Sequence, residues 1–240
     1  MNTQEIALQM LRAHPVVLDT ESTGLADVDQ IIEIAIIGIH GTTCLNHLVK
    51  ATKLSHPKAL ETHGISQATL DQHGLPWEEI LLSLNAVFSD HPVAMFNAVF
   101  DTRLIAQTCA AHGTNQPDDY RTFDIMELAN RHFVRHAKWD ENSSQFKRLS
   151  LARCCELAGV KFDGNAHRAV VDCHATLDLL KFMAQDTATQ QTTNDDVLVI
   201  EAAPIPEKTC NYPACNCPFD MDHREQCLRG YERQKAGANK

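Results

Sequence analysis

The chain has 240 residues, enough for one α/β domain with a large core and a modest appendage, but not comfortably for two large domains. Its formal net charge of −10 is the wrong sign for a protein that holds a polyanion through bulk electrostatics. The longest apolar stretch, near Ile34 to Ile39, falls far short of the roughly 18 residues of a membrane span. The N-terminus MNTQEIALQMLRAHP lacks the basic start and apolar run of a secretory signal, so we expect a cytoplasmic protein without membrane association.

Three strands are predicted near the start of the chain. PVVLDT (15–20) and IIEIAIIGI (31–39) are apolar runs, the second rich in β-branched residues, and CLNHLV (44–49) follows a turn at Gly41. Such closely spaced strands predict a meander.

Strands and helices alternate after this meander. LPWEEILLSLNAVF (75–88) has apolar residues at helical spacing after a proline, which predicts a helix. The further predicted elements are a strand at 92–96, a helix at 100–113, a strand near 120–123, and helices at 124–132 and 150–158. A last helix is predicted from near His167 to about Gln185, with one buried stripe of Val170, Cys173, Leu177, Leu180 and Ala184. This order predicts an α/β domain with a mixed sheet.

Positive charge is concentrated in the middle of the chain. Residues 1–120 hold 5 Lys or Arg against 14 Asp or Glu, whereas residues 121–153 hold 7 basic against 4 acidic residues. The seven are Arg121, Arg131, Arg135, Lys138, Lys147, Arg148 and Arg153. They are candidates for contacts with phosphates, and the alternative is an ordinary solvated face.

A pair of carboxylates ends the first predicted strand. Asp19 and Glu21 are two residues apart, so both side chains point to the same face and both can reach one metal ion. The alternative is a pair of solvated acids. The apolar run before the pair and the STGL that follows favour a site, because Gly24 permits close backbone approach to a ligand.

Two later segments add to this pair. Asp101 in FNAVFD lies in the first turn of a predicted helix, where an acid can simply complement the helix dipole. In HRAVVD, Asp172 lies beside the buried stripe, where an acid is costly unless it is paired or binds a metal, and His167 lies at the helix start. Four carboxylates and one imidazole are the inventory of two-metal phosphodiester hydrolysis. A histidine can take the proton from the attacking water.

The order DTESTGL, NAVFD and HRAVVD resembles the three motifs of the DEDDh family, the DnaQ-like, proofreading-type 3′→5′ exonucleases, over roughly residues 13–185. QIIEIAIIGI, HGIS (63–66) and RLSLARCCELAGV (148–160) support it. The resemblance implies a ribonuclease H-like fold, with a mixed five-stranded sheet flanked by helices and a small Cys-rich C-terminal appendage.

The resemblance also assigns roles to the motif residues. It implies that Asp19, Glu21 and Asp172 hold one Mg²⁺ or Mn²⁺, that Asp19 bridges to a second, and that Asp101 completes the set. His167 would be the general base, because the sister subclass uses a nearby tyrosine and the tyrosines here lie elsewhere, at Tyr120, Tyr212 and Tyr231. The residues that would contact the substrate are Ser22, Thr23, Gly24, Leu25, His63 and Asn97. Glu33 is assigned to the sheet rather than to the chemistry.

The function predicted is a metal-dependent 3′→5′ exonuclease acting on single-stranded DNA. A 3′→5′ exoribonuclease and a non-catalytic nucleic-acid-binding module of the same fold are the alternatives. The predicted partner is a nucleic acid with a free 3′ end. A polymerase or other protein, or a second copy of the chain, stays open as a further partner. Bound metal ions would reverse the local negative charge and so let this acidic protein bind the nucleic acid.

The cysteines form two groups. Cys44, Cys109, Cys154, Cys155 and Cys173 are dispersed and are expected to be small buried hydrophobic residues. The other four cysteines lie within residues 210–240, at Cys210, Cys215, Cys217 and Cys227. Zinc is the natural candidate for a metal bound by these thiolates, and an iron–sulfur cluster or free thiols are the alternatives. We therefore predict an exonuclease domain at 1–185, an acidic and polar linker at 186–209, and this tail.

Overall fold

The computed structural model describes residues 2–140, 145–162 and 167–185. The helices of this part are α1 (Thr3–Arg12), α2 (Pro57–His63), α3 (Gln67–His73), α4 (Trp77–Asp90), α5 (Ala98–His112), α6 (Ile125–His132), α7 (Leu151–Ala158) and α8 (Ala169–Gln185), with a short 3-10 helix at Val134–His136. The strands are β1 (Val16–Ser22), β2 (Ile31–Ile37), β3 (Thr43–Leu48), β4 (Val93–Met95), β5 (Thr122–Asp124), β6 (Trp139–Asp140) and β7 (Gln145–Phe146).

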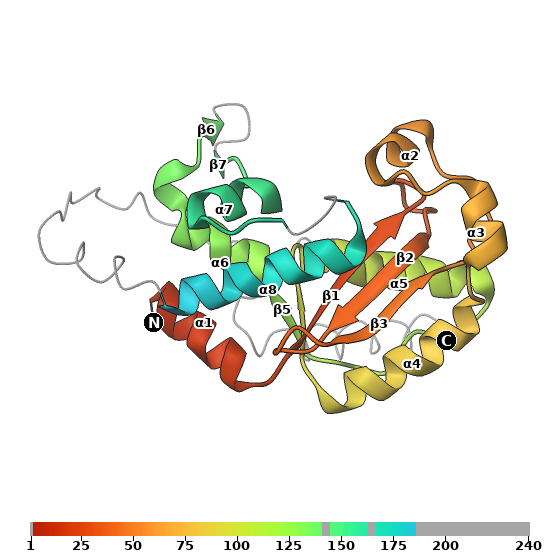
Figure 1. Ribbon diagram of the computed structural model, residues 1–240, viewed down its shortest axis with the longest axis horizontal. Coiled ribbons are helices and arrows are strands. Elements are labelled where there is room, and N and C mark those ends of the chain that lie inside the picture. Colours follow the sequence, from red (N-terminus) through yellow and green to blue (C-terminus); the bar gives the residue numbers. More distant parts are fainter. Residues whose placement is uncertain (1, 141–144, 163–166, 186–240) are drawn as a thin grey trace, which may run out of the picture. The chain divides into compact units, whose positions relative to one another are not determined.

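Five strands form a mixed sheet in the order β3-β2-β1-β4-β5 (Figure 1). The first three pair antiparallel, and β4 pairs parallel with both β1 and β5. The predicted mixed five-stranded sheet flanked by helices is therefore confirmed. The carboxyl ends of β1 and β4 point the same way, so residues that follow them meet at one edge.

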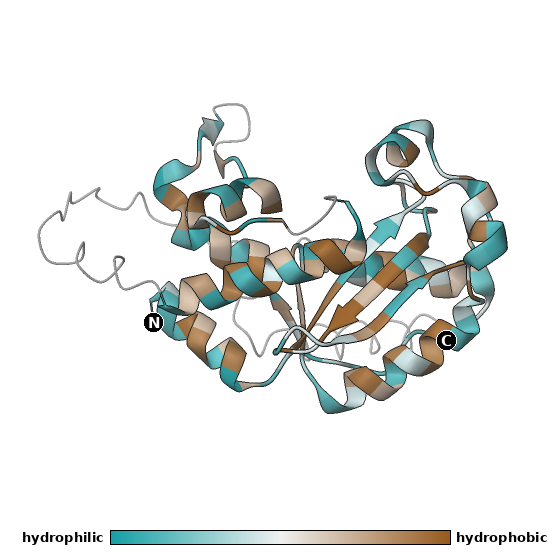
Figure 2. Ribbon diagram, viewed as in Figure 1, coloured by the Kyte–Doolittle hydropathy of each residue, from teal (hydrophilic) through white to brown (hydrophobic). Residues whose placement is uncertain are grey.

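The alternating side chains of the strands pack into two cores. Val17 and Ala35 lie in one core with residues of α1, α6, α7 and α8, whereas Val16 and Leu18 lie in the other with residues of α4 and α5. Strand β2 is buried along its whole length, as a central strand covered on both faces should be. Figure 2 shows apolar colouring along parts of the sheet and on stretches of the helices that cover it.

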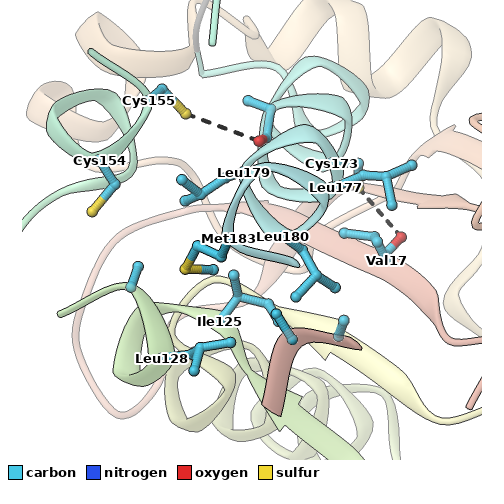
Figure 3. Close-up of a cluster of buried hydrophobic side chains, with 14 of the residues drawn as sticks. Val17, Ile125, Leu128, Cys154, Cys155, Cys173, Leu177, Leu179, Leu180 and Met183 are labelled. Atoms are coloured by element: carbon cyan, nitrogen blue, oxygen red, sulfur yellow. Dashed lines mark hydrogen bonds between the residues drawn. The ribbon is translucent and has the colours of Figure 1, made fainter. Parts of the chain in front are cut away.

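Helix α8 is the main support of one face. The predicted stripe is buried at Cys173, Leu177, Leu180 and Ala184, but the buried surface is wider, because α1 and α7 also pack on this helix. Figure 3 shows how Leu179 and Met183 extend the buried surface. The helix begins at Ala169, two residues later than predicted.

The cysteine prediction holds for four of the five dispersed residues. Cys109, Cys154, Cys155 and Cys173 are buried, and burial raises the pKa of Cys155 to about 12, so the thiol stays neutral. In Figure 3 the Cys173 thiol donates to the Val17 carbonyl, with sulfur and oxygen 3.5 Å apart. Cys44 is exposed, so the prediction was wrong there; it lies on β3, the edge strand, whose side chains mostly face solvent.

Several short elements and the first helix were not predicted. They are the helices α1, α2 and α3, the 3-10 helix at Val134–His136, and the hairpin of β6 and β7. Helix α1 begins with a capping box, in which the Asn2 side chain accepts from the Glu5 N–H while the Glu5 carboxylate accepts from the Asn2 N–H. Helices α2 and α3 have only seven residues each, too few for a recognisable period.

The linker at 186–209 and the tail at 210–240 lie outside the described residues, so the predicted division at these positions stays a prediction. Within the described ranges, the helices are all too short or too polar to traverse a lipid bilayer.

Candidate active site

Three of the predicted metal ligands approach one another at the carboxyl end of β1. Asp19 and Glu21 alternate with core residues of β1 and face α8, whose first turn carries Asp172. One ligand atom each from Glu21, His167 and Asp172 lie within 4.8 Å of one another. The fold thus brings together a strand and a helix that are far apart in sequence.

Asp101 reaches the site from the other side of the strand. Its side chain is buried in the first turn of α5, and the Thr20 hydroxyl donates to its Oδ1 over 2.7 Å. Asp101 is therefore not a solvent-exposed acid that merely complements the dipole of α5. The N–H of Ala98, at the start of this helix, instead donates to Asp124 Oδ2 over 3.1 Å. Sequence reasoning missed Asp124, which also caps α6 through the Glu127 N–H.

Burial raises the pKa of all four carboxylates, and neighbouring acids add to the rise. Burial raises the pKa of Asp19 well above its usual range, and the neighbouring charges of Asp101 and Asp172 add to the rise. Burial, followed by the Asp172 carboxylate, raises the pKa of Glu21 to about 8.

Burial also raises the pKa of Asp101 to about 7, although the hydrogen bond from Thr20 lowers it. The pKa of Asp172 is raised mainly by burial, and His167 opposes the rise. The repulsion within such a carboxylate cluster is reduced when the carboxylates bind protons or a cation.

The donor set fits a hard divalent cation. Asp172 Oδ1 is buried and accepts no hydrogen bond from the described residues, which leaves a lone pair free for a ligand. Carboxylate oxygens are the ligands that Mg²⁺ and Mn²⁺ prefer. The sequence-predicted residues Asp19, Glu21, Asp101 and Asp172 are therefore chemically suited to such ions.

His167 occupies an unusual backbone position. It is exposed, lies two residues before α8, and has a φ of 64°, which non-glycine residues seldom adopt. This turns the chain sharply between residue 167 and the helix. The backbone conformation must be held by its neighbours.

Glu33 and Arg168 supply that support. Glu33 is 1% exposed on β2, directly opposite Glu21, and its carboxylate accepts from Arg168 Nη2 at 2.7 Å and Nε at 3.0 Å. It also accepts from the Ala169 N–H at 3.0 Å, the first residue of α8. Glu33 was assigned to the sheet, but it also fixes Arg168 and Ala169, the two residues that follow His167. A charged residue inside an apolar strand was the signal for this role.

We expect Arg168→Met to destabilise the protein by about 2 kcal/mol, because it leaves the buried Glu33 carboxylate without its cationic partner. Nuclease activity should fall as well, since the His167 turn loses its anchor. Arg153→Met is the matched control, because Arg153 pairs with Glu156 on the exposed surface of α7 and should change stability by less than about 0.5 kcal/mol. Urea unfolding and single-turnover rates measure both effects. Equal stability of the two variants would contradict the assigned role.

The predicted substrate residues surround the cluster with different degrees of exposure. Leu25 is 77% exposed, and Arg103 holds its loop through the Leu25 carbonyl and the Asp27 carboxylate. Ser22 is buried, and its hydroxyl donates to the Gly24 carbonyl over 2.7 Å.

Thr23 and Gly24 are buried around Asp29. A Cβ at Gly24 would lie 2.5 Å from Asp29 Oδ2, so the close approach of Asp29 already requires glycine at this position. The Thr23 hydroxyl donates to the same Asp29 carboxylate, and Lys53 pairs with it. Asp29 thereby shapes the loop that presents Leu25.

His63 and Asn97 complete the predicted set. His63 is buried with its Nδ1 accepting from the Ile65 N–H and its Nε2 without a partner among the described residues, and burial lowers its pKa. Asn97 begins α5 with a φ of 78° and makes no side-chain cap. Among the described residues, His63 Nε2 makes no hydrogen bond and the Asn97 side chain does not cap α5. These polar groups are therefore available to a substrate.

A separate groove lies at the opposite end of the strands. Its lining includes His14, Ile39, Cys44, Val87 and His91. The described lining has one carboxylate, Asp90, so it lacks the acidic cluster of the other end. We place no chemistry there.

The mixed sheet, with acids converging from β1, α5 and α8, defines a nuclease of the ribonuclease H-like fold. A family model described as Exonuclease (RNase_T) matches residues 16–180, and the chain belongs to this DnaQ-like exonuclease family.

Similar proteins agree with this assignment. The uncharacterised exonuclease CP81 of Escherichia phage 186 is 31% identical over 185 residues, which make up 76% of this chain and 94% of that protein. E. coli Exonuclease I in complex with a dA16 oligonucleotide matches at a TM-score of 0.58 with 16% identity, over 74% of this chain and 42% of that one. Exonuclease X in complex with 5′-overhanging duplex DNA matches at a TM-score of 0.51 with 22% identity, over 70% and 90%. At these identities the structures show the fold alone, and the chain spans less than half of Exonuclease I.

Proposed function

We propose that this exonuclease removes nucleotides from the 3′ ends of single-stranded DNA with two divalent cations. The observation that carries the proposal is the convergence of four acids whose pKa values are raised by burial and by neighbouring carboxylates. When bound, the cations would stabilise the attacking and leaving oxygens of an in-line displacement. Asp19, Glu21 and Asp172 would hold one ion, and Asp19 and Asp101 the other.

The chain's own residues would position the reacting groups. Leu25, exposed beside the cluster, would contact the terminal nucleotide, with Ser22, Thr23 and Gly24 fixing its loop. His63 Nε2 and the Asn97 side chain are the polar groups left for the substrate. His167 is exposed next to Glu21 and Asp172, where its imidazole can take the proton from the attacking water.

We expect His167→Ala to lower kcat by about 10²- to 10⁴-fold, the usual contribution of a general base. His73→Ala is the control, because His73 is also exposed but ends α3 away from the acidic cluster. Initial rates with a 5′-labelled oligonucleotide in Mg²⁺ measure both variants. An unchanged kcat for His167→Ala would remove this residue from the mechanism.

Matched DNA and RNA oligonucleotides test the function as a whole. Each would be supplied single- and double-stranded, labelled at the 5′ or the 3′ end, and incubated with Mg²⁺ or Mn²⁺. We expect mononucleotides to appear first from the 3′ end of single-stranded DNA. Faster loss of RNA would favour an exoribonuclease, and internal cuts or release from the 5′ end would refute the proposal.

We also keep the zinc site of Cys210, Cys215, Cys217 and Cys227 as a proposal for the tail, which lies outside the described residues. Its support is a set of four thiols in a segment too small to build a core. Elemental analysis of the purified protein without stoichiometric zinc would end it.

A further inference from the structure

An exposed aromatic pair lies on the hairpin of β6 and β7. The Trp139 and Phe146 side chains are 54% and 52% exposed, and their rings meet edge to face with centroids 5.1 Å apart. The two residues are direct partners in the hairpin, so both rings stand on the same face. Exposed apolar side chains that gather in one place are typical of binding surfaces.

Positive charge surrounds this pair. Arg131, Arg135, Lys138, Lys147 and Arg148 are exposed, and none forms an ion pair within the described part of the chain. Lys138 and Lys147 directly flank the two rings and are joined through the Lys147 N–H and the Lys138 carbonyl over 2.8 Å. A chain with a net charge of −10 therefore gathers five basic side chains around a hairpin in which Asp140 is the one acid among the described residues.

The hairpin is connected to the acidic cluster through packed helices. The Leu149 N–H, just after β7, donates to Asn130 of α6 over 2.8 Å, and the chain then enters α7. Helix α7 packs on α8, which carries Asp172 in its first turn. In Figure 1 the hairpin and α7 lie on the same side of α8.

We propose that Trp139 and Phe146, with Lys138, Lys147 and Arg148, bind the single-stranded DNA upstream of the 3′ end that occupies the acidic cluster. Bases stack on aromatic faces and phosphates meet the flanking cations, and both halves of this recognition are present within a few residues. An acidic protein partner would also complement the basic residues, but its binding would not explain the aromatic pair at their centre. The proposal rests on the proposed function, since it places the substrate's end in that site.

Fluorescence tests this surface directly, because Trp77 is fully buried and Trp139 is the exposed tryptophan. The inactive Asp19→Asn protein would be titrated with dT3 and dT20 in Mg²⁺. We expect dT20 to quench the emission and to bind at least tenfold more tightly than dT3. Trp139→Ala and Phe146→Ala should each reduce the ratio of the affinities for dT20 and dT3 by about tenfold. Fluorescence anisotropy of the labelled oligonucleotides measures these affinities. Leu82→Ala, which alters another exposed side chain on α4, should leave this ratio intact.

Salt dependence adds an independent measurement. Lys138→Ala and Lys147→Ala should each reduce the slope of log Kd against log salt for dT20 by about 0.7. An unchanged preference for dT20 in both aromatic variants, or quenching by polyglutamate in place of dT20, would overturn the proposal. Quenching of Trp139 by dT20 in a wild-type chain without nuclease activity would refute the proposed function but support this binding surface.

Discussion

Asp19→Asn should reduce nuclease activity by at least about 10³-fold while leaving the fold intact. Asp19 is the residue proposed to hold both ions, and the charges of Asp101, Asp172 and Glu21 all raise its pKa. Its removal would therefore disturb both ions at once. Single-turnover degradation of a 5′-labelled oligonucleotide in Mg²⁺ measures the loss.

The same substitution should stabilise the metal-free protein. The amide removes a buried charge and its repulsion with neighbouring carboxylates, so Tm should rise by about 3 °C, the shift that roughly 1 kcal/mol makes in a domain of this size. Asp178→Asn is the control, because Asp178 is exposed further along α8 and pairs with Lys181 on the surface. Wild-type activity in Asp19→Asn would refute the assigned site. A lower Tm would show instead that Asp19 supports the fold.

Glu21→Gln should make the metal-free protein less sensitive to pH. The pKa of Glu21 is about 8 in the folded state and 4.5 ordinarily, so the folded chain binds an extra proton between these values. Stability therefore falls as pH rises from about 4.5 to 8, because the folded state still holds a proton that the unfolded state has released, and rising pH favours the state with fewer bound protons. Wild type and Glu21→Gln should have equal Tm near pH 4.5, and the variant should be about 5 °C more stable at pH 8.5.

Thermal scans in EDTA over this pH range measure the difference. Mg²⁺ should raise the Tm of the wild type more at pH 8 than at pH 6, because the cation replaces protons that the acids hold at lower pH. Glu156→Gln is the control, because Glu156 is exposed on α7. Parallel Tm curves for wild type and Glu21→Gln would show that Glu21 titrates as an ordinary surface acid.

Local patterns in the sequence predicted most of the sheet and its two longest helices. Strand β2 was recognisable because a central strand is apolar along its length, and α8 because its apolar residues recur at helical spacing. The acids of the site were found by their order in three motifs, since each alone has an ordinary explanation. Their proximity required the fold, which joins Glu21 of β1 to Asp172 of α8.

The features that were missed depend on contacts between distant segments. Glu33 pairs with Arg168, 135 residues away, and no local pattern reports such a partner. Asp124 caps α6 in the usual way, but its second oxygen holds the start of α5, 26 residues earlier. The hairpin of β6 and β7 has strands of two residues, below the length at which alternation can be recognised.

The place of α8 at the end of the described chain has a consequence for the order of assembly. The Cys173 thiol reaches the Val17 carbonyl across 156 residues, and Asp172 beside it joins acids that belong to β1. During synthesis, the meander of β1, β2 and β3 can pair early through local contacts, whereas the last acid arrives only when α8 docks. On the proposed mechanism, which needs Asp172, a nascent chain gains nuclease activity only after nearly the whole domain has left the ribosome.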